Sequence, residues 1–150
     1  MRRFALLLLC WPFLCGAIQA SRTFDGANDE IDFGNVYDVT TGDLSLCVWW
    51  KGTEDASADW IVGKRVDNAA NTAGYALRQD STDPNVFIVA DGVADDFVTG
   101  TDTDGVWVWL CGTWNAAADE QSLYENGVGA TESAVIGSLT SAANLQIGEA

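Results

Sequence analysis

The sequence predicts an all-β fold, and two observations support that prediction. Short runs rich in β-branched and aromatic residues recur between clusters of Gly, Asn and Asp, as in strands separated by turns. No segment keeps apolar residues at helical spacing for three turns. The chain has 150 residues, which suits one domain, so we expect one sandwich-like unit over residues 21–150 behind a leader segment.

Residues 1–20 are predicted to be a secretory signal peptide. Arg2 and Arg3 precede an apolar stretch, and residues 17–20 (Ala-Ile-Gln-Ala) place small residues at the two positions that a signal peptidase recognises. The apolar stretch is too short and too interrupted for a permanent membrane helix, which needs about 20 apolar residues. We therefore expect cleavage after residue 20, a secreted protein and no membrane insertion after cleavage.

Ten short runs are predicted strands, because each combines apolar or β-branched residues with flanking turn residues. They are Arg22–Phe24, Glu30–Phe33, Leu44–Lys51, Trp60–Gly63, Gly74–Arg78, Val86–Ala90, Asp96–Thr99, Val106–Trp114, Gln121–Glu125 and Asn144–Ile147. Residues 44–51 and 106–111 are apolar on both faces, which predicts central strands buried on each side. Asn126-Gly127 suits a type I′ turn that folds the chain back as a hairpin.

Composition excludes several classes of function. Lys and Arg number 7 against 22 Asp and Glu, which gives a formal net charge of -15. Such a chain is a poor partner for nucleic acid or for an anionic membrane, because both attract Lys and Arg. The sequence contains no histidine, which excludes Ser-His-Asp and Cys-His mechanisms and every His-ligated zinc site.

Two of the four cysteines remain after the predicted cleavage. Export implies an oxidising compartment, so Cys47 and Cys111 are expected to pair rather than persist as free thiols. A disulfide between them requires the two strands to be neighbours, because its geometry keeps the two Cα atoms close. The alternative is a pair of buried free thiols.

Several short motifs are spread along the chain: Phe24-Asp25-Gly26, residues 29–34, residues 44–51, Leu123–Gly127 and Leu145–Gly148. Together they resemble laminin G-like domains of the concanavalin A-like lectin and glucanase superfamily. Residues 109–116 (Trp-Leu-Cys-Gly-Thr-Trp-Asn-Ala) resemble the pentraxin signature His-x-Cys-x-Ser/Thr-Trp-x-Ser/Thr, with the histidine and the last hydroxyl replaced. The resemblance implies an antiparallel two-sheet jelly-roll sandwich over residues 21–150 and a disulfide from Cys111 to Cys47.

Residues 64–68 (Lys-Arg-Val-Asp-Asn) resemble the pentraxin segment in which an adjacent Asp-Asn pair supplies calcium ligands. The resemblance implies that Asp67 and Asn68 offer oxygen atoms to calcium, a hard cation. The family takes further ligands from an acidic loop after the strand matched by residues 145–148, and only Glu149 and Ala150 follow that strand. The alternative interpretation of residues 67–71 is an ordinary solvated turn.

Residues 30–33 (Glu-Ile-Asp-Phe) partly resemble the Glu-x-Asp-x-x-Glu motif of β-glucanases with the same fold. Retaining hydrolysis needs two carboxyl groups about 5 to 5.5 Å apart. No second glutamate follows at either register, so no catalytic residue is predicted. A polysaccharide-active enzyme of this fold is kept as an alternative function.

Six tryptophans remain after the predicted cleavage. Large aromatic side chains in central strands usually fill a core and shield a disulfide, so most of them are expected to be buried. Trp60 is the candidate for exposure and ligand contact, because it follows the polar stretch 52–59.

The chain resembles a laminin G-like domain that lacks its last strand or strands, since the family commonly continues past the segment matched by residues 145–148. An uncovered sheet edge favours pairing with another chain, including self-association. We expect a secreted, non-catalytic recognition module that binds a glycan or another extracellular ligand, with calcium as a candidate cofactor. A structural cell-surface or matrix interaction domain is the further alternative.

Overall fold

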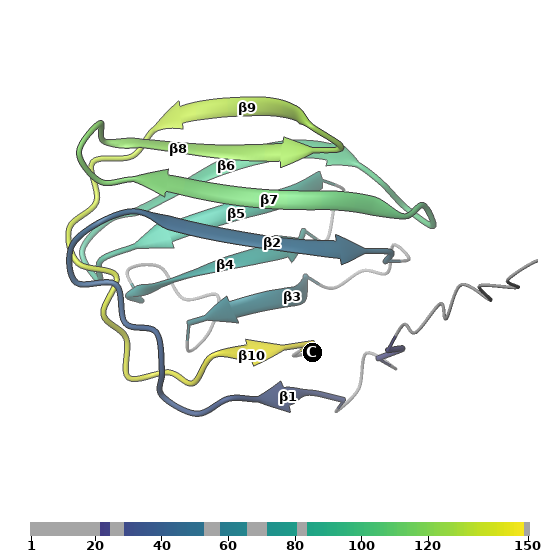
Figure 1. The fold of residues 1–150 in the computed structure, drawn as a ribbon, viewed down its shortest axis with the longest axis horizontal. Coiled ribbons are helices and arrows are strands. Elements are labelled where there is room, and N and C mark those ends of the chain that lie inside the picture. The colour runs from purple at the N-terminus through teal and green to yellow at the C-terminus, as the bar shows by residue number, and fades with distance from the viewer. Residues whose placement is uncertain (1–21, 25–28, 53–57, 66–71, 81–83, 149–150) are drawn as a thin grey trace, which may run out of the picture.

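The computed structural model describes residues 22–24, 29–52, 58–65, 72–80 and 84–148. These residues form ten β-strands and no helix, so the all-β prediction is confirmed (Figure 1). In the same ranges, no helix long and apolar enough to cross a membrane is found. The strands are β1 (Ile31–Asp32), β2 (Leu44–Trp50), β3 (Asp59–Lys64), β4 (Gly74–Gln79), β5 (Pro84–Ala90), β6 (Asp95–Asp102), β7 (Val108–Asn115), β8 (Glu120–Glu125), β9 (Val128–Ser133) and β10 (Gln146–Ile147).

The strands form two antiparallel sheets packed face to face. One sheet has six strands in the order β1-β10-β3-β4-β5-β6, and the other has four in the order β2-β7-β8-β9. Strands far apart in the sequence are neighbours, because β1 pairs with β10 and β2 pairs with β7. The predicted jelly-roll sandwich is therefore confirmed.

The core lies between the sheets and is built from alternate residues of the strands. In β7, Val108, Leu110 and Trp114 point inward and are buried. Gly112 lies between them, opposite Phe87 of β5. A Cβ atom on Gly112 would lie 2.2 Å from the Phe87 ring, so a residue without a side chain is needed at this close approach.

The two sheets differ in width. Strands β8 and β9 contact β6, and β7 faces β5 through Gly112, so the four-stranded sheet stacks over the β4–β6 side of the six-stranded sheet. Figure 1 shows β3, β10 and β1 extending beyond the edge formed by β2. Ile61 of β3 is buried in the main core and Ile147 of β10 packs against it, so this side of the six-stranded sheet also contributes to the core.

The turn between β8 and β9 confirms the predicted hairpin. Asn126 and Gly127 both have positive φ, at 50° and 86°, as a type I′ turn requires. Asn126 also fixes the end of β7, since its side-chain oxygen accepts a hydrogen bond from Trp109 N at 3.1 Å and its own N–H donates to Trp109 O at 2.9 Å. The sequence interpretation missed β9, in which every residue is exposed and no apolar alternation marks the strand.

Two predictions about strands are wrong. Residues 22–24 form no strand, and the Phe24 ring instead lies against Gly148, where a Cβ atom would be 2.2 Å from it. Strands β2 and β7 are not buried on both faces, because none of the described strands forms a third layer over the outer face of the four-stranded sheet. β2 is also an edge strand rather than a central one.

Candidate functional site

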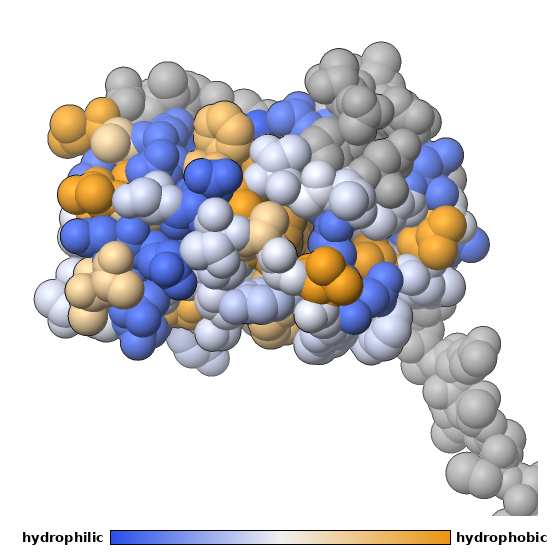
Figure 2. Space-filling model, turned by 90° about the horizontal axis from the view of Figure 1, so that it is seen from above, coloured by the Kyte–Doolittle hydropathy of each residue, from blue (hydrophilic) through white to orange (hydrophobic). Residues whose placement is uncertain are grey.

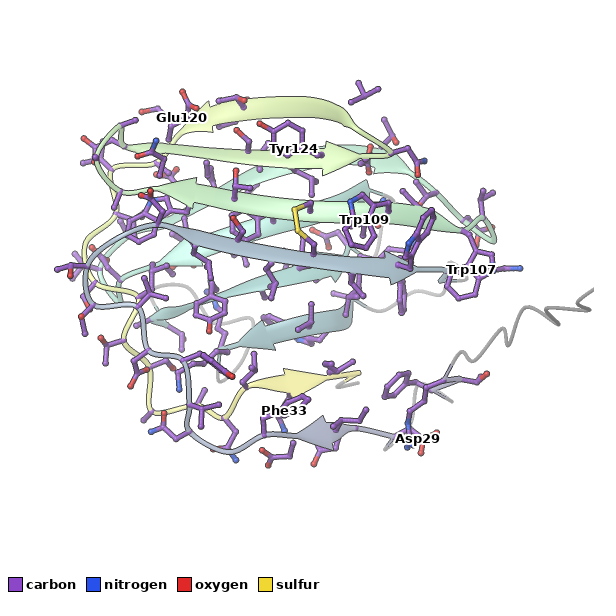
Figure 3. The ribbon with its side chains drawn as sticks, in the orientation of Figure 1. Asp29, Phe33, Trp107, Trp109, Glu120 and Tyr124 are labelled. Carbon is purple, nitrogen blue, oxygen red and sulfur yellow. A yellow bond between two sulfur atoms is a disulfide. The ribbon has the colours of Figure 1, made fainter. Side chains whose placement is uncertain are left out.

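Large aromatic side chains gather at the surface of the four-stranded sheet. Trp49 of β2 is 61% exposed. Trp107 just before β7 is 50% exposed, and Trp109 of β7 and Tyr124 of β8 are 37% and 38% exposed (Figure 3). We call these four residues the aromatic face. In contrast, apolar and polar residues are interspersed on the side of the molecule seen in Figure 2. A clustered apolar surface is more informative than scattered exposed residues, because it commonly marks an interaction site.

The strand register produces the aromatic face. Trp49 lies directly opposite Trp109 in the β2–β7 pair, and their ring centroids are 5.7 Å apart with the planes inclined at 54°. Because side chains alternate along a strand, Trp49 shares its side of β2 with Ser45 and with Lys51, which follows the strand. These polar neighbours are the signal that could have predicted an outward-facing tryptophan, and the sequence interpretation placed most tryptophans in the core instead.

The predicted Cys47–Cys111 disulfide is present and joins neighbouring strands, as its geometry required. It lies on the same outer side of the sheet, two residues along each strand from the Trp49–Trp109 pair. The expectation that tryptophans bury this bond in a core is wrong, since Cys47 is exposed. The bond instead ties together the two strands that present the tryptophan pair.

Tyr124 extends the aromatic face across the sheet. It lies opposite Cys111 of β7 on one side and opposite Gly129 of β9 on the other. A Cβ atom on Gly129 would lie 2.6 Å from the Tyr124 ring, so the ring lies over this glycine. The absence of a side chain at this position lets the ring rest on the sheet surface.

A cleft of about 380 Å³, here called the end cleft, adjoins the aromatic face. Val48 and Trp50 of β2 line one side, and Ile61 of β3 and Ile147 of β10 line the other. It occupies the space that the unequal width of the two sheets leaves beside β2. Its apolar walls pack against the main core, so the position of the cleft is set by the sandwich itself.

The end cleft is continuous with the aromatic face and contains a few polar groups. Trp49 and Trp107 belong to both. Arg22 and Lys51 supply its charged side chains. The indole N–H of Trp50 is buried and has no hydrogen-bond partner within the described part of the chain. A concave apolar site with a few convergent polar groups is the usual form of a small-ligand site.

A second cleft, of about 280 Å³, lies at the other end of β2 and is lined by Tyr37, Asp38 and Tyr75, among others. The Tyr75 hydroxyl donates a hydrogen bond to the Tyr37 carbonyl at 2.8 Å. Burial raises the pKa of Tyr75, and the nearby Asp38 carboxylate raises it further. The phenol therefore stays protonated at neutral pH and acts as a structural donor.

Lys64 is fully buried and has a structural role. Its ammonium donates to the Ala143 carbonyl at 2.8 Å, contacts the Asn35 side-chain oxygen and lies 3.3 Å from Asp38. These contacts connect β3 to the segment before β2 and to the segment before β10. A buried charge needs such partners, because an unpaired one would be strongly destabilising.

The ligand-contacting residue expected from the sequence, Trp60, lies elsewhere. Trp60 is only 9% exposed and packs with Ala76 and Ile88 on the face of the six-stranded sheet that points away from the main core. Its predicted exposure is wrong. The prediction rested on the polar segment before Trp60, but the neighbouring strands of the sheet cover the side chain. Asp67 and Asn68 lie outside the described residues. Within those ranges, no group of three His, Cys, Asp or Glu side chains is placed to hold a metal ion.

The carboxylates of the glucanase-like motif make structural hydrogen bonds. Gln146 donates to Glu30 at 2.7 Å, and Asn144 donates to Asp32 at 2.8 Å. The other Asp32 oxygen accepts the Gly34 N–H at 2.6 Å. Both side chains therefore hold the first strand against the segment around β10.

The two antiparallel sheets form the jelly-roll sandwich that the motifs implied, and a family comparison agrees. A laminin G family model, described as the concanavalin A-like lectin/glucanases superfamily, matches residues 25–150. The chain belongs to this superfamily, which confirms the resemblance seen in its motifs, while the closer pentraxin likeness stays a prediction. No curated protein matches the sequence significantly.

Solved structures share the fold at low sequence identity. The CBM40 of a Ruminococcus gnavus IT-sialidase, bound to α2,3-sialyllactose, has a TM-score of 0.57 and 9% identity over 80% of this chain and 77% of its own. The α2,6-sialyllactose complex gives 0.53, with 10% identity over 80% and 78%. A leech intramolecular trans-sialidase complexed with 2,7-anhydro-Neu5Ac gives 0.55, with 14% identity over 81% of this chain and 22% of its own. These likenesses show the fold alone.

Proposed function

We propose that this protein is a secreted, non-catalytic recognition module that binds glycans through its aromatic face and end cleft. Exposed aromatic rings offer apolar faces that suit the C–H faces of sugar rings. Fold analogy supports the ligand class, since the similar Ruminococcus gnavus CBM40 structures contain sialyllactose.

The observation that carries the proposal is the exposure of Trp49, Trp107 and Trp109 together. Burial of a large apolar side chain stabilises a fold by about 1.5–3 kcal/mol, so three exposed tryptophans forgo a substantial gain. Trp49 and Trp109 are also held on paired strands beside a disulfide, which fixes their relative positions. Rigid elements are suited to presenting a binding surface.

Isothermal calorimetry with glycans selected on an array tests the proposal. Trp49→Ala and Trp109→Ala should each weaken binding at least tenfold, which corresponds to about 1.4 kcal/mol. Phe97→Ala is the matched control, because Phe97, at 58%, is nearly as exposed as Trp49 but lies on β6 of the other sheet. The absence of any glycan ligand, or equal losses in the Phe97 variant, would contradict the proposal.

The proposed secretion depends on the leader at residues 1–20. Expression in a secreting host should release a mature protein whose first residue is Ser21, as determined by N-terminal sequencing. Intact-mass measurement should show Cys47 and Cys111 oxidised. Protein that stays cell-associated with its leader attached would contradict this part of the proposal.

Calcium assistance is proposed through Asp67 and Asn68. Calorimetric titration with calcium should give a binding heat for the unaltered protein that is reduced in Asp67→Ala and in Asn68→Ala. Glycan titrations with calcium and with a chelator would then show whether the ion supports ligand binding. Identical heats for all three proteins would contradict the calcium role.

The absence of catalysis is also part of the proposal. Glu30 and Asp32, the carboxylates closest to a glycosidase pattern, make the hydrogen bonds to Gln146, Asn144 and Gly34 described above. We expect no release of reducing ends from a panel of β-glucans. Turnover that disappears in Glu30→Gln would instead support the enzyme alternative.

A second candidate function is protein recognition at the free edge of β2. One edge of β2 pairs with β7, and the described residues make no backbone hydrogen bonds along its other edge. Such an edge can accept an extended segment by strand addition. Since β3, β10 and β1 extend beneath this edge, a single extended segment fits better than the sandwich of a second copy. Light scattering over a wide concentration range tests this: a stable monomer is expected, and dimers would favour self-association.

A further inference from the structure

Basic side chains are scarce in this acidic chain, and most of those described are engaged by carboxylates. The close pairs are Arg65–Asp95 at 2.7 Å, Arg78–Asp80 at 3.1 Å and Lys64–Asp38 at 3.3 Å. Lys51 makes no ion pair with any described residue. Arg22 approaches Asp29 only at 4.0 Å, between two exposed side chains, and an exposed pair of this kind contributes little.

The two loosely engaged cations line the same site. Lys51 follows β2 and Arg22 comes from the segment that lies near β10, and both line the end cleft. No acidic residue is among the described residues that line it, although the chain has 22 Asp and Glu. The described lining of the end cleft therefore carries two positive and no negative side chains, on a molecule whose net charge is -15.

We infer that the end cleft binds the carboxylate of an acidic sugar between Lys51 and Arg22, with the sugar ring against Trp107 and Trp49. This inference rests on the proposed function and specifies its ligand class. A guanidinium matches a carboxylate in bidentate geometry, and charge-assisted hydrogen bonds are stronger than neutral ones.

The size of the end cleft and the charge around it limit the ligand further. Its volume of about 380 Å³ lies near the lower end of the range for small-ligand sites, roughly 300–1,000 Å³, and suits one terminal sugar. The acidic remainder of the surface repels polyanions, because like charges raise the free energy of association. The ligand is therefore a glycan with an isolated terminal carboxylate rather than a highly sulfated or repeating polyanion.

Calorimetry with matched sugars tests the inference. The probes are 3′-sialyllactose and a glucuronic acid-terminated disaccharide, each compared with its neutral carboxyl-reduced form, and heparin as a polyanion. Each acid should bind at least tenfold more tightly than its reduced form, and heparin should bind more weakly than either acid. Lys51→Gln and Arg22→Gln should each weaken acid binding at least fivefold and reduce the ratio of acid affinity to neutral-form affinity.

Val93→Glu is the control for net charge. Like Lys51→Gln it makes the chain more acidic, but Val93 is 82% exposed in the turn between β5 and β6, outside the end cleft. It should leave acid binding within twofold. Neutral forms that bind as tightly as the acids, or acid binding unaffected by Lys51→Gln, would overturn the inference and leave the proposed function intact. No binding of any glycan would overturn both.

Discussion

Gly112 marks the closest approach of the two sheets, and its lack of a side chain has an energetic consequence. A methyl group at this position would lie 2.2 Å from the Phe87 ring, so either the ring or β7 must move. Overpacking of this kind typically costs about 1–3 kcal/mol. We predict that Gly112→Ala lowers the free energy of unfolding by that amount in urea denaturation, and that adding Phe87→Leu restores part of it. An unchanged midpoint would contradict this packing.

The hydrogen bonds of the Asp91 carboxylate make the stability of the fold depend on pH. Its carboxylate accepts the N–H groups of Ala94 and Val93, each at 2.8 Å, and that of Gly137 at 3.0 Å. These hydrogen bonds, that from Ala94 first, lower the pKa of Asp91 in the folded protein. The ionised form therefore stabilises the fold above the pKa of the unfolded chain, near 3.9, and this contribution is lost as pH falls through the lower folded value.

The Asp91→Asn variant should therefore be less stable than the unaltered protein at pH 7. When the pH falls below about 4, its free energy of unfolding should decrease by less than that of the unaltered protein. Urea midpoints measured from pH 7 to pH 2 would show the two curves converging. Parallel curves for Asp91→Asn would contradict the role of its hydrogen bonds.

The β2–β7 pair is the element on which the aromatic face depends. The Cys47–Cys111 bond closes a loop with a sequence separation of 64 residues, and in the loop-entropy model it stabilises the fold by about 4 kcal/mol. We predict that replacing both cysteines with serine lowers the free energy of unfolding by about that amount in urea denaturation. The same variant should bind glycans more weakly, because the tryptophan pair lies two residues away. Unchanged stability and affinity would contradict this.

At the element level, the sequence predicted best where strands have a buried side. β5 is a β-branched and aromatic run in which residues 85–90 are all buried, and β7 alternates buried with more exposed residues; both were expected close to their observed positions. β9 has only exposed residues, so no apolar pattern could mark it. The exposure of Trp49 and Trp109 was not predicted. An apolar residue type alone does not show whether the second face of a strand is buried or is an exposed binding surface.

At the scale of the whole molecule, the end cleft could not have been predicted from local patterns. It results from how far the four-stranded sheet covers the six-stranded one, which depends on contacts between residues distant in the sequence. The motifs predicted which strands exist and the superfamily they belong to. They did not indicate that Val48, Trp50, Ile61 and Ile147 meet beside the free edge of β2.

The indole N–H resonances of the tryptophans test most directly the central claim, that the aromatic face and the end cleft are the glycan-binding surface. In a ¹⁵N-labelled protein titrated with 3′-sialyllactose, the resonances of Trp49, Trp107 and Trp109 should shift in a saturable way. Those of Trp60 and Trp114, which are buried away from this surface, should stay in place. Single Trp→Phe substitutions assign each resonance, so exposed and buried tryptophans are compared within the same protein sample. Shifts confined to Trp60 or Trp114, or no shift at saturating ligand, would contradict the claim.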